Sequence, residues 1–194
     1  MNGKLKHSIT ISPGELMINH GMTVVVSDRT MQLRENTSQG VYCNDTRFIS
    51  HHRYRFNNQP LVLLTAGYVD YYSSIAHYTN PMLKLTSGEL PTNQLRLRVV
   101  RQIEHGRVLD DLRVTNYAME PVTIGLVIEI KSDFADIFEV RGIHAPFRGA
   151  VETVWDAQAH MLTNTYRQGE FFAQMGYHIA VADSPPTYSN GELV

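Results

Sequence analysis

The stretch Leu95-Arg96-Leu97-Arg98-Val99 alternates apolar and charged side chains with a period of two. Successive side chains of a β-strand point to opposite faces, so this pattern predicts a strand with one buried and one solvated face. The same period recurs between Val122 and Ile130, where every second residue is apolar. Less regular segments of this kind occur at residues 22–26, 47–56, 61–68, 108–115, 160–166 and 178–181.

Turn-forming residues separate these segments. Asn57-Asn58-Gln59-Pro60, Glu104-His105-Gly106 and Arg167-Gln168-Gly169-Glu170 are spaced as hairpin tips. Strands joined at this spacing by short turns are typical of antiparallel sandwiches and barrels. We therefore expect an all-β fold, a large antiparallel β-sandwich (supersandwich-like) with little helix. Residues 151–160 are the best remaining candidate for a helix.

The length of the chain and its C-terminal composition indicate the domain organisation. A chain of 194 residues suits one large β domain, which we expect at residues 1–183. Residues 184–194 combine adjacent prolines with serine, asparagine and glycine. This composition favours a linker or a frayed C-terminal tail.

Charge and cysteine content exclude several classes of protein. The net charge is −2, whereas nucleic-acid binding needs a concentrated positive field. Arginines at 47, 53 and 55, and at 96, 98 and 101, alternate with other residues, and we interpret them as solvated sheet faces. Cys43 is the only cysteine, which excludes an intrachain disulfide and favours a reducing compartment.

No segment of the sequence resembles a membrane anchor or a signal peptide. The segment Met1–Lys6 lacks an apolar core, and the longest apolar runs, at 24–26 and 61–64, are too short to cross a bilayer. We expect a soluble, cytoplasmic protein without a nucleic-acid or membrane partner.

Metal binding and catalysis have weak candidates. His51 and His52 are adjacent, so on a strand they point to opposite faces and cannot hold one ion. We expect the histidines to be scattered over surface and turns, and we predict neither a metal nor a cofactor. Asp133 and Asp136 have the spacing of a carboxylate pair for glycoside hydrolysis. Acidic residues in turns more often accept backbone N–H bonds, so we expect no catalytic residue.

A cluster of aromatic residues offers a different function. Tyr68, Tyr71 and Tyr72 lie close together, and flat rings of this kind can stack on the apolar faces of sugars. Tyrosine is also a favoured strand residue, and ordinary packing is the preferred interpretation. The substrate-binding alternative stays open at these three residues.

Two blocks of the sequence carry a resemblance to a known family. The first is the glycine-led segment from Gly40 to Ser50, which contains Asp45-Thr46-Arg47-Phe48, and the second runs from Asp133 to Gly142. In order and spacing they resemble the N-terminal domain of prokaryotic glycogen debranching (amylo-α-1,6-glucosidase-like) enzymes. Shorter matches at 26–29, 79–81, 116 and 121–122 extend the likeness over roughly residues 16–150.

The resemblance implies a β-sandwich that precedes an (α/α)-barrel catalytic domain in the same parent protein. In such glycoside hydrolases the acid and base that cleave α-1,6-glucosidic branches belong to the barrel, so this chain is expected to support or shape the active site without catalysing. The expected partners are that barrel and an α-glucan. The alternatives are a stand-alone carbohydrate-binding module that uses the region Tyr68–Tyr78 and a small glycosidase that uses Asp133 and Asp136.

The same two blocks contain charged residues that we expect to order a loop. Arg47 and Arg141 can form bidentate pairs with Asp45, Asp136 or Glu139 if their segments meet. The predicted loop-ordering or domain-docking residues are Asp45, Arg47, Asp133, Asp136, Glu139 and Arg141. A docking surface also predicts an exposed apolar patch, and therefore self-association into a homo-oligomer.

Overall fold

The computed structural model describes residues 14–86, 88–143, 147–180 and 184–194. Within these ranges the strands form five antiparallel sheets, and the one helix, α1 (Ile137–Val140), is a single turn. The all-β, antiparallel class expected from the sequence is confirmed. No helix of the described ranges is long and apolar enough to cross a bilayer. The segment Met1–Lys6, which lacks the apolar core of a signal peptide, lies outside the described residues.

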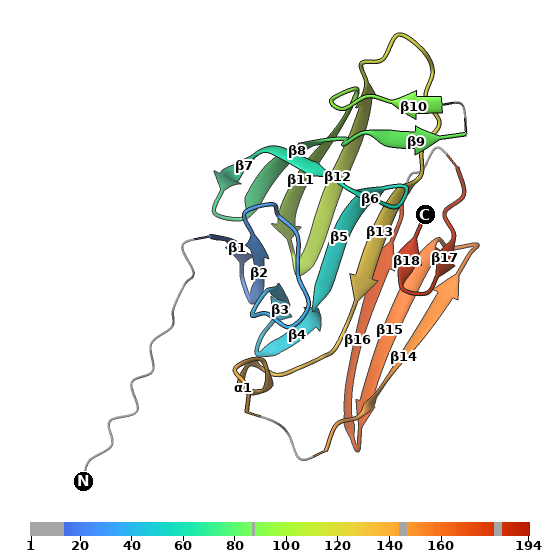
Figure 1. Cartoon of the computed structure of the whole chain (residues 1–194). Helices are drawn as coiled ribbons and strands as arrows, with labels where there is room; N and C mark the ends of the chain where they lie inside the picture. Colours follow the sequence, from blue (N-terminus) through green and yellow to red (C-terminus); the bar gives the residue numbers. More distant parts are fainter. Residues whose placement is uncertain (1–13, 87, 144–146, 181–183) are drawn as a thin grey trace.

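Hairpins and pairings between distant strands together build the sheets, and we name four of the sheets after one strand each (Figure 1). The β2 sheet has the order β1 (Glu15–His20), β2 (Thr23–Asp28), β3 (Gly40–Cys43), β4 (Thr46–Ile49). The β11 sheet has the order β12 (Arg107–Asn116), β11 (Leu95–Glu104), β8 (Ser73–Thr79), β7 (Val62–Asp70). The β13 sheet has the order β17 (Tyr188–Ser189), β18 (Glu192–Leu193), β13 (Leu126–Lys131), β5 (His51–Phe56), β6 (Gln59–Pro60). The β15 sheet has the order β14 (Ala150–Asp156), β15 (Met161–Gln168), β16 (Phe171–His178), and β9 (Leu83–Leu85) pairs with β10 (Gly88–Leu90).

The alternation in β11 produces the fold as the sequence predicts. Leu95, Leu97 and Val99 are buried, and the strand pairs with β12 along its whole length. The turn between these strands places His105 and Gly106 at φ +46° and +77°, a region in which glycine is the least strained residue. Hairpin tips also form at the two other predicted turns, after β5 and after β15.

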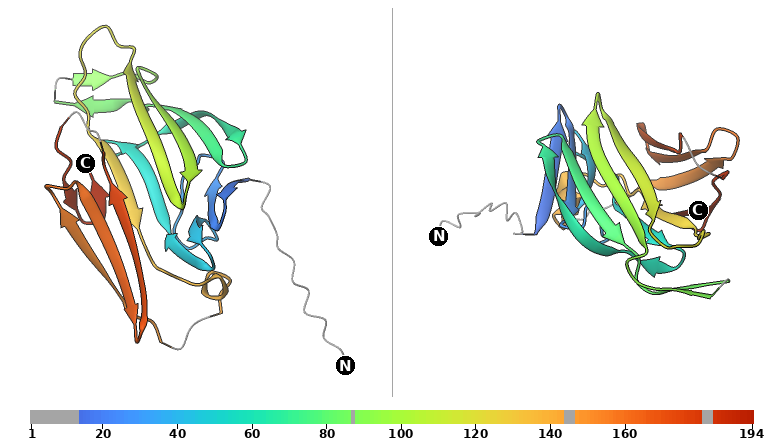
Figure 2. Two further views of the ribbon diagram at one scale, coloured as in Figure 1. Left: turned by 180° about the vertical axis from the view of Figure 1, so that it is seen from behind. Right: turned by 90° about the horizontal axis from the view of Figure 1, so that it is seen from above.

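One hydrophobic core joins four of the sheets. Its buried side chains come from the β11, β13 and β15 sheets and from the β9–β10 pair, and they include Tyr54, Tyr78, Leu97, Ile130 and Leu162. Strands β5 and β13 lie between the β11 sheet and the β15 sheet when the molecule is seen from the front, from behind and from above (Figures 1 and 2). The buried apolar side chains of β5 and β13 therefore pack together with those of the β11 sheet and of the β15 sheet.

Two segments differ from the expectations drawn from the sequence. The helix candidate at residues 151–160 is wrong, because residues 150–156 form β14, which pairs with β15 in continuous register. Residues 184–194, expected to be a linker or a frayed tail, contribute β17 and β18 to the β13 sheet. The reason is that Leu193, 1% exposed, is buried in the main core, and its burial holds the two short strands in place.

Arg101 ties the sheets together from the buried face of β11. Its Nε and one Nη donate to the two carboxylate oxygens of Asp110 on β12, at 2.8 and 2.7 Å. The other Nη donates to the backbone carbonyl of Met31 at 3.0 Å. The Nη that reaches Asp110 also lies 3.1 Å from Nδ1 of His52 on β5. One guanidinium carried by β11 thus contacts β12 of the same sheet, β5 of the β13 sheet and the segment between β2 and β3.

The network continues to the β15 sheet through His52. Nε2 of His52 lies 3.3 Å from the hydroxyl of Tyr177 on β16, and the hydroxyl of Tyr54 donates to Asp110. Burial, and then the charge of Arg101, lower the pKa of His52 to about 3, so its ring is neutral. Burial alone would raise the pKa of Asp110, but the charge and hydrogen bonds of Arg101, together with the hydrogen bond from Tyr54, outweigh burial and lower that pKa to about 2.

Two interpretations of charged residues are wrong at this network. Arg101 was expected on a solvated face together with Arg96 and Arg98, but it lies on the same side of β11 as Leu97 and Val99 and is 2% exposed. The adjacent histidines are buried as well, although they do point to opposite faces of β5. His51 contacts Glu129 on β13, with 2.7 Å between Nε2 and Oε2.

Replacing Arg101 should be far more costly than replacing a neighbouring arginine. Arg101→Met leaves the Asp110 carboxylate buried without its cation, and we expect the free energy of unfolding in urea to fall by about 3–5 kcal/mol. Arg98→Met is the matched control, because Arg98 forms a largely solvated pair with Asp111 and should lose about 1 kcal/mol or less. Equal losses in the two variants would contradict the assignment.

The buried, neutral His52 predicts a pH dependence of stability. Its folded-state pKa, about 3, is below the ordinary 6.5, so between these values the unfolded chain binds a proton that the folded chain does not. The free energy of unfolding should therefore fall as the pH is lowered from 6.5. His52→Asn should flatten this slope between pH 6.5 and 4.5, above the range in which acidic side chains ordinarily titrate, whereas His105→Asn in the exposed turn should keep it. Chemical unfolding at a series of pH values measures both slopes, and an unchanged slope in His52→Asn would refute the prediction.

Candidate functional site

The first family block forms the hairpin β3–β4, and its glycine is required by a close contact. Gly40 opens β3, and the side chain of Arg47 on β4 passes directly over it. A Cβ atom at position 40 would lie 2.5 Å from Cδ of Arg47 and 2.8 Å from the carbonyl oxygen of Ile49. Only glycine leaves room for the buried arginine at this point.

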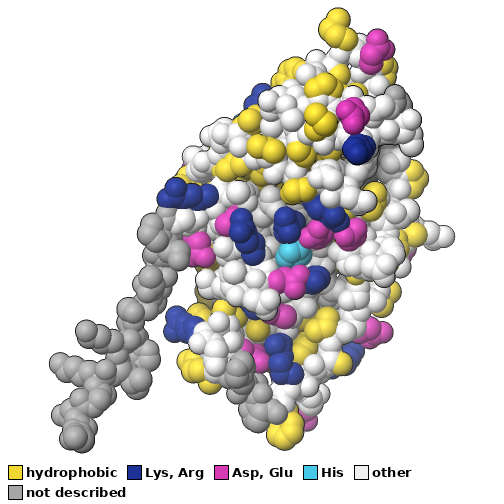
Figure 3. Space-filling model, in the orientation of Figure 1, with side chains coloured by type: hydrophobic (Ala, Val, Ile, Leu, Met, Phe, Trp, Pro, Cys, Tyr) yellow, Lys and Arg dark blue, Asp and Glu magenta, His cyan; other side chains and the backbone are white. Residues whose placement is uncertain are grey.

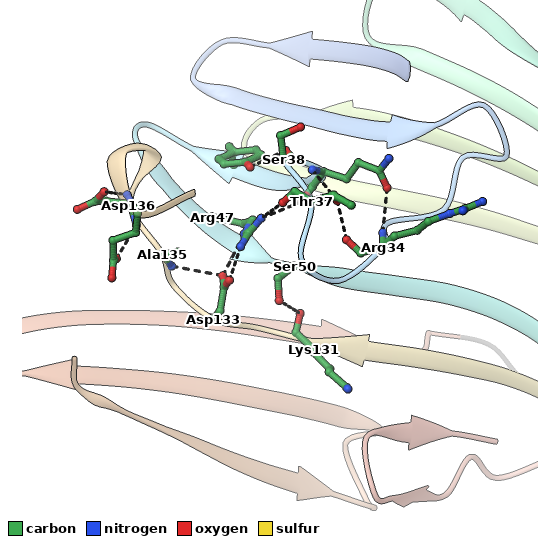
Figure 4. Close-up of polar contacts among 12 residues, drawn as sticks. Arg34, Thr37, Ser38, Arg47, Ser50, Lys131, Asp133, Ala135 and Asp136 are labelled. Atoms are coloured by element: carbon green, nitrogen blue, oxygen red, sulfur yellow. Dashed lines mark hydrogen bonds and ion pairs between the residues drawn. The ribbon is translucent and has the colours of Figure 1, made fainter. Parts of the chain in front are cut away.

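Arg47 is the centre of a polar cluster that joins the two family blocks (Figure 4). Its Nε and one Nη donate to the two carboxylate oxygens of Asp133, at 3.2 and 2.5 Å. The other Nη donates to the backbone carbonyls of Thr37 and Gln39, at 2.7 and 3.3 Å. Burial alone would lower the pKa of Arg47, but the hydrogen bonds and charge of Asp133 raise it above its ordinary value. The guanidinium is therefore a permanent cation with its donors satisfied.

The partner of Arg47 differs from the one expected. The sequence suggested Asp45, Asp136 or Glu139, whereas the structure brings Asp133 to the guanidinium. Asp45 is exposed, and its backbone carbonyl accepts from the amide of Ile137 at 2.9 Å. Its contribution to the cluster is thus made by the backbone.

Asp136 and Glu139 form the N-terminal cap of α1. Oδ1 of Asp136 accepts the backbone N–H bonds of Phe138 and Glu139, at 2.7 and 2.8 Å. Oε2 of Glu139 accepts the amide of Asp136 at 3.0 Å, which completes a capping box. Capping by Asp136 is the structural alternative that the sequence analysis preferred over acid–base catalysis. Both acids of the proposed catalytic pair are thus engaged, Asp133 with Arg47 and Asp136 with α1.

The segment before α1 is anchored by a buried aromatic side chain. Phe134 is 3% exposed and adopts a φ of +50°, which is strained for a residue with a large side chain. Its ring stacks on Tyr166 of β15 at a centroid distance of 5.7 Å and meets Phe48 of β4 edge-on at 5.5 Å. Burial of Phe134 between two sheets compensates for the strain and fixes the position of α1.

Arg148 belongs to the cluster, although nothing in the sequence pointed to it except its nearness to the second block. Its guanidinium donates to the backbone carbonyl of Asp133, and its Nε lies 3.5 Å from Oε1 of Glu139. Arg141, expected in this role, follows α1 as its C-cap residue and is exposed. Among the described residues no carboxylate is paired with Arg141.

Exposed apolar side chains lie on α1, in the described residues that follow it and at the tip of the β15–β16 hairpin. Phe138, Ile143 and Phe147 are 59%, 62% and 79% exposed, and the backbone carbonyl of Phe147 is held at 2.7 Å by the side chain of Gln168 at the tip of the β15–β16 hairpin. Phe171, on the other side of that tip, is 51% exposed. We call these four residues the α1 surface. Hydrophobic side chains are visible at the lower end of the molecule, where α1 lies (Figure 3).

The tyrosines proposed for sugar binding lie away from this cluster, next to β1. Tyr68 and Tyr71 are more than half exposed and Tyr72 is half-buried. The rings of Tyr71 and Tyr72 are 5.1 Å apart but inclined by 78°, and the hydroxyl of Tyr68 accepts the amide of Met17. An edge-to-face pair does not form the flat platform that stacks on sugar rings. Tyr78, in contrast, is buried in the core.

The described residues contain no group of three or more histidine, cysteine or acidic side chains placed to hold a metal ion. Cys43, the one cysteine of the sequence, is half-buried at the end of β3.

Comparison with known proteins identifies one family. A family model for the N-terminal domain of (some) glycogen debranching enzymes matches residues 18–194. The match extends the resemblance seen over residues 16–150 and includes strands β14 to β18. None of the curated proteins and none of the solved structures matched the chain.

Removing the charge of Asp133 should loosen α1. Asp133→Asn leaves the buried guanidinium of Arg47 without its anion, and we expect the free energy of unfolding to fall by about 2–3 kcal/mol. Faster hydrogen exchange at the amides of Arg47 and Ile137 should accompany this loss, because these amides hold the hairpin and α1 together. Asp45→Asn is a matched control at an exposed acid nearby and should change stability by about 0.5 kcal/mol or less. Similar behaviour of the two variants would contradict the role given to Asp133.

Proposed function

This chain belongs to the family of N-terminal domains of glycogen debranching enzymes, and we propose that it is a non-catalytic domain that docks onto the catalytic part of such an enzyme. In this proposal an (α/α)-barrel of the same parent protein hydrolyses α-1,6-glucosidic branches, as in amylo-α-1,6-glucosidases. The present domain supports that barrel and helps to shape the mouth of its active site.

The observation that carries the proposal is the α1 surface. Phe138, Phe147 and Phe171 are each more than half exposed, although burying a phenylalanine side chain stabilises a protein by about 1.5–3 kcal/mol. Phe138 lies on α1, whose backbone is fixed by the Arg47–Asp133 pair and by the capping box. The backbone of Phe147 is held by the side chain of Gln168, and Phe171 is part of β16. A rigid apolar surface bordered by charged groups is typical of a surface that another folded domain covers.

The charges around the α1 surface suit a domain interface. Arg141 and Asp45 are exposed beside it, and Arg148 and Glu139 form a partly solvated pair. Charged groups at the border of an apolar centre determine which surfaces dock and in what orientation. We therefore propose that Arg141 acts at this interface, with an acidic group of the barrel as its partner.

Hydrolysis by this chain has no comparable support. Asp133 and Asp136, the best candidates for an acid and a base, are engaged with Arg47 and with the N-terminus of α1. Both carboxylates are used in contacts within the domain, so we propose that the catalytic acid and base belong to the barrel. We also propose a cytoplasmic enzyme, because a single half-buried cysteine suits a reducing compartment.

The test compares Phe138→Ser/Phe147→Ser with Met119→Ser in the full-length debranching enzyme. The double variant should uncouple the two domains in thermal unfolding and lower the debranching rate, because each truncated anchor weakens an interface by about 2 kcal/mol. Met119 is 97% exposed on the loop after β12, at the other end of the molecule, so its variant should behave like the wild type.

The isolated chain provides a second measurement of the same surface. Uncovered phenylalanines should make it self-associate at high concentration, and the double variant should stay monomeric in sedimentation experiments. A monomeric wild-type chain, together with an unaffected full-length double variant, would refute the docking function.

A further inference from the structure

A second candidate site lies on the outward face of the β11 sheet, close to the β9–β10 hairpin. It is a shallow depression of about 420 Å³ lined by side chains from three strands and two loops. The lining residues used below are Thr65, His77, Asn93, Arg96 and Tyr117. The volume lies within the range of small-molecule sites. The loop that carries Tyr117 and the helix α1 lie at opposite ends of the molecule (Figure 1).

Arg96 and His77 form the polar floor of this depression. Nε and one Nη of Arg96 lie 3.2 and 2.7 Å from Nδ1 of His77. Arginine has no acceptor, so Nδ1 must accept and the ring proton must be on Nε2. Burial, and then the charges of Arg96 and Arg98, lower the pKa of His77 and keep this ring neutral. Nε2–H is thus a donor outside this contact.

Arg96 differs from Arg98 in having no carboxylate that neutralises its charge among the described residues. Arg98, two residues along β11, pairs with Asp111 at 3.0 Å. Among the described residues Arg96 has no carboxylate within ion-pair distance, and its hydrogen-bond partner is a neutral ring. A half-buried guanidinium with spare donors at the floor of a depression can bind a polar ligand.

The rim of the depression is held rigidly by a buried asparagine. Asn80 is 0% exposed, its Oδ1 accepts the amides of Gln94 and Leu95 at 2.9 and 2.7 Å, and its Nδ2 donates to the carbonyls of Pro81 and Pro91. These bonds fix the turn in which Asn93 adopts a φ of +64°. The family segment at residues 79–81 therefore shapes this turn.

Tyr117 stands on the opposite rim with an open ring. Its side chain is 57% exposed, while its amide donates to the carbonyl of Gln94 at 2.8 Å. Asn116 holds the loop by accepting the amide of Ala118 and donating to the carbonyl of Glu120. The backbone is thus fixed while the aromatic face stays available to a ligand.

We propose that this depression binds a glucose unit of an α-glucan chain, with the ring of Tyr117 stacked on the sugar and Arg96, His77 and Asn93 bound to its hydroxyl groups. The choice of glucan rests on the proposed function. The chemistry of the site agrees with it, because sugar hydroxyls both donate and accept, and the lining supplies cationic and neutral donors, an amide and a hydroxyl. At the far end from α1, the site holds the polymer while the docked catalytic domain cleaves a branch.

Calorimetric titration of the full chain with maltoheptaose and, separately, with inorganic phosphate tests the proposal. We expect maltoheptaose to bind with a dissociation constant on the order of 1 mM. Tyr117→Ala and Arg96→Gln should each weaken binding roughly tenfold. Tyr71→Ala, at an equally exposed tyrosine outside the depression, should leave the affinity unchanged. Thermal unfolding of each variant checks that the substitution does not affect folding.

Three results would overturn the proposal. They are no binding of maltoheptaose, binding that Tyr71→Ala abolishes while Tyr117→Ala does not, and binding of phosphate alone at Arg96. The Phe138→Ser/Phe147→Ser variant leaves the depression intact and should keep the affinity of the wild type. Failure of glucan binding with intact domain docking would remove this inference and keep the proposed function. Failure of domain docking with intact glucan binding would remove the docking function and keep the glucan site.

Discussion

The buried ion pair between Arg101 and Asp110 is the interaction on which the arrangement of the sheets depends. A guanidinium removed from water is costly unless its donors are satisfied, and here those donors contact β12, β5 and the segment between β2 and β3. His52 passes the network on to Tyr177 and thus to the β15 sheet. Apolar packing alone is tolerant of small displacements, whereas this network requires each strand at a defined position.

The same chemistry recurs nearer the surface with a different result. Arg47 pairs with Asp133 in the same way that Arg101 pairs with Asp110. The Arg47–Asp133 pair, however, lies at the end of the molecule and orders a loop. Gly40, Phe134 and the capping box of α1 all help to position that loop, on which Phe138 faces solvent. The loop that carries Tyr117 lies at the opposite end of the molecule from α1 (Figure 1), so the proposed domain docking and the proposed glucan binding use separate parts of the structure.

Parts of the candidate site were predictable and others were not. The two family blocks placed Arg47 and Asp133 in one predicted cluster, and the spacing of Asp136 and Glu139 is that of a capping box. The identity of the partner of Arg47 depends on how residues 86 positions apart meet. The part played by Arg148 depends on its contact with the backbone carbonyl of Asp133. The depression at Tyr117 could not be predicted from the sequence, because its residues come from three strands and two loops that meet only in the folded chain.

Alternation along each strand was enough to determine the all-β class, the hairpin turns and the buried faces, since these depend on neighbours in the chain. It even places Arg101 on the side of Leu97 and Val99, although a charged residue was assumed to face solvent. Only the tertiary structure decided that Asp110, His52 and Met31 would make that burial tolerable. It also decided that residues 150–156 form a strand and that Leu193 returns to the core. The physical reason is that burial and pairing are set by contacts between distant segments, which no local pattern specifies.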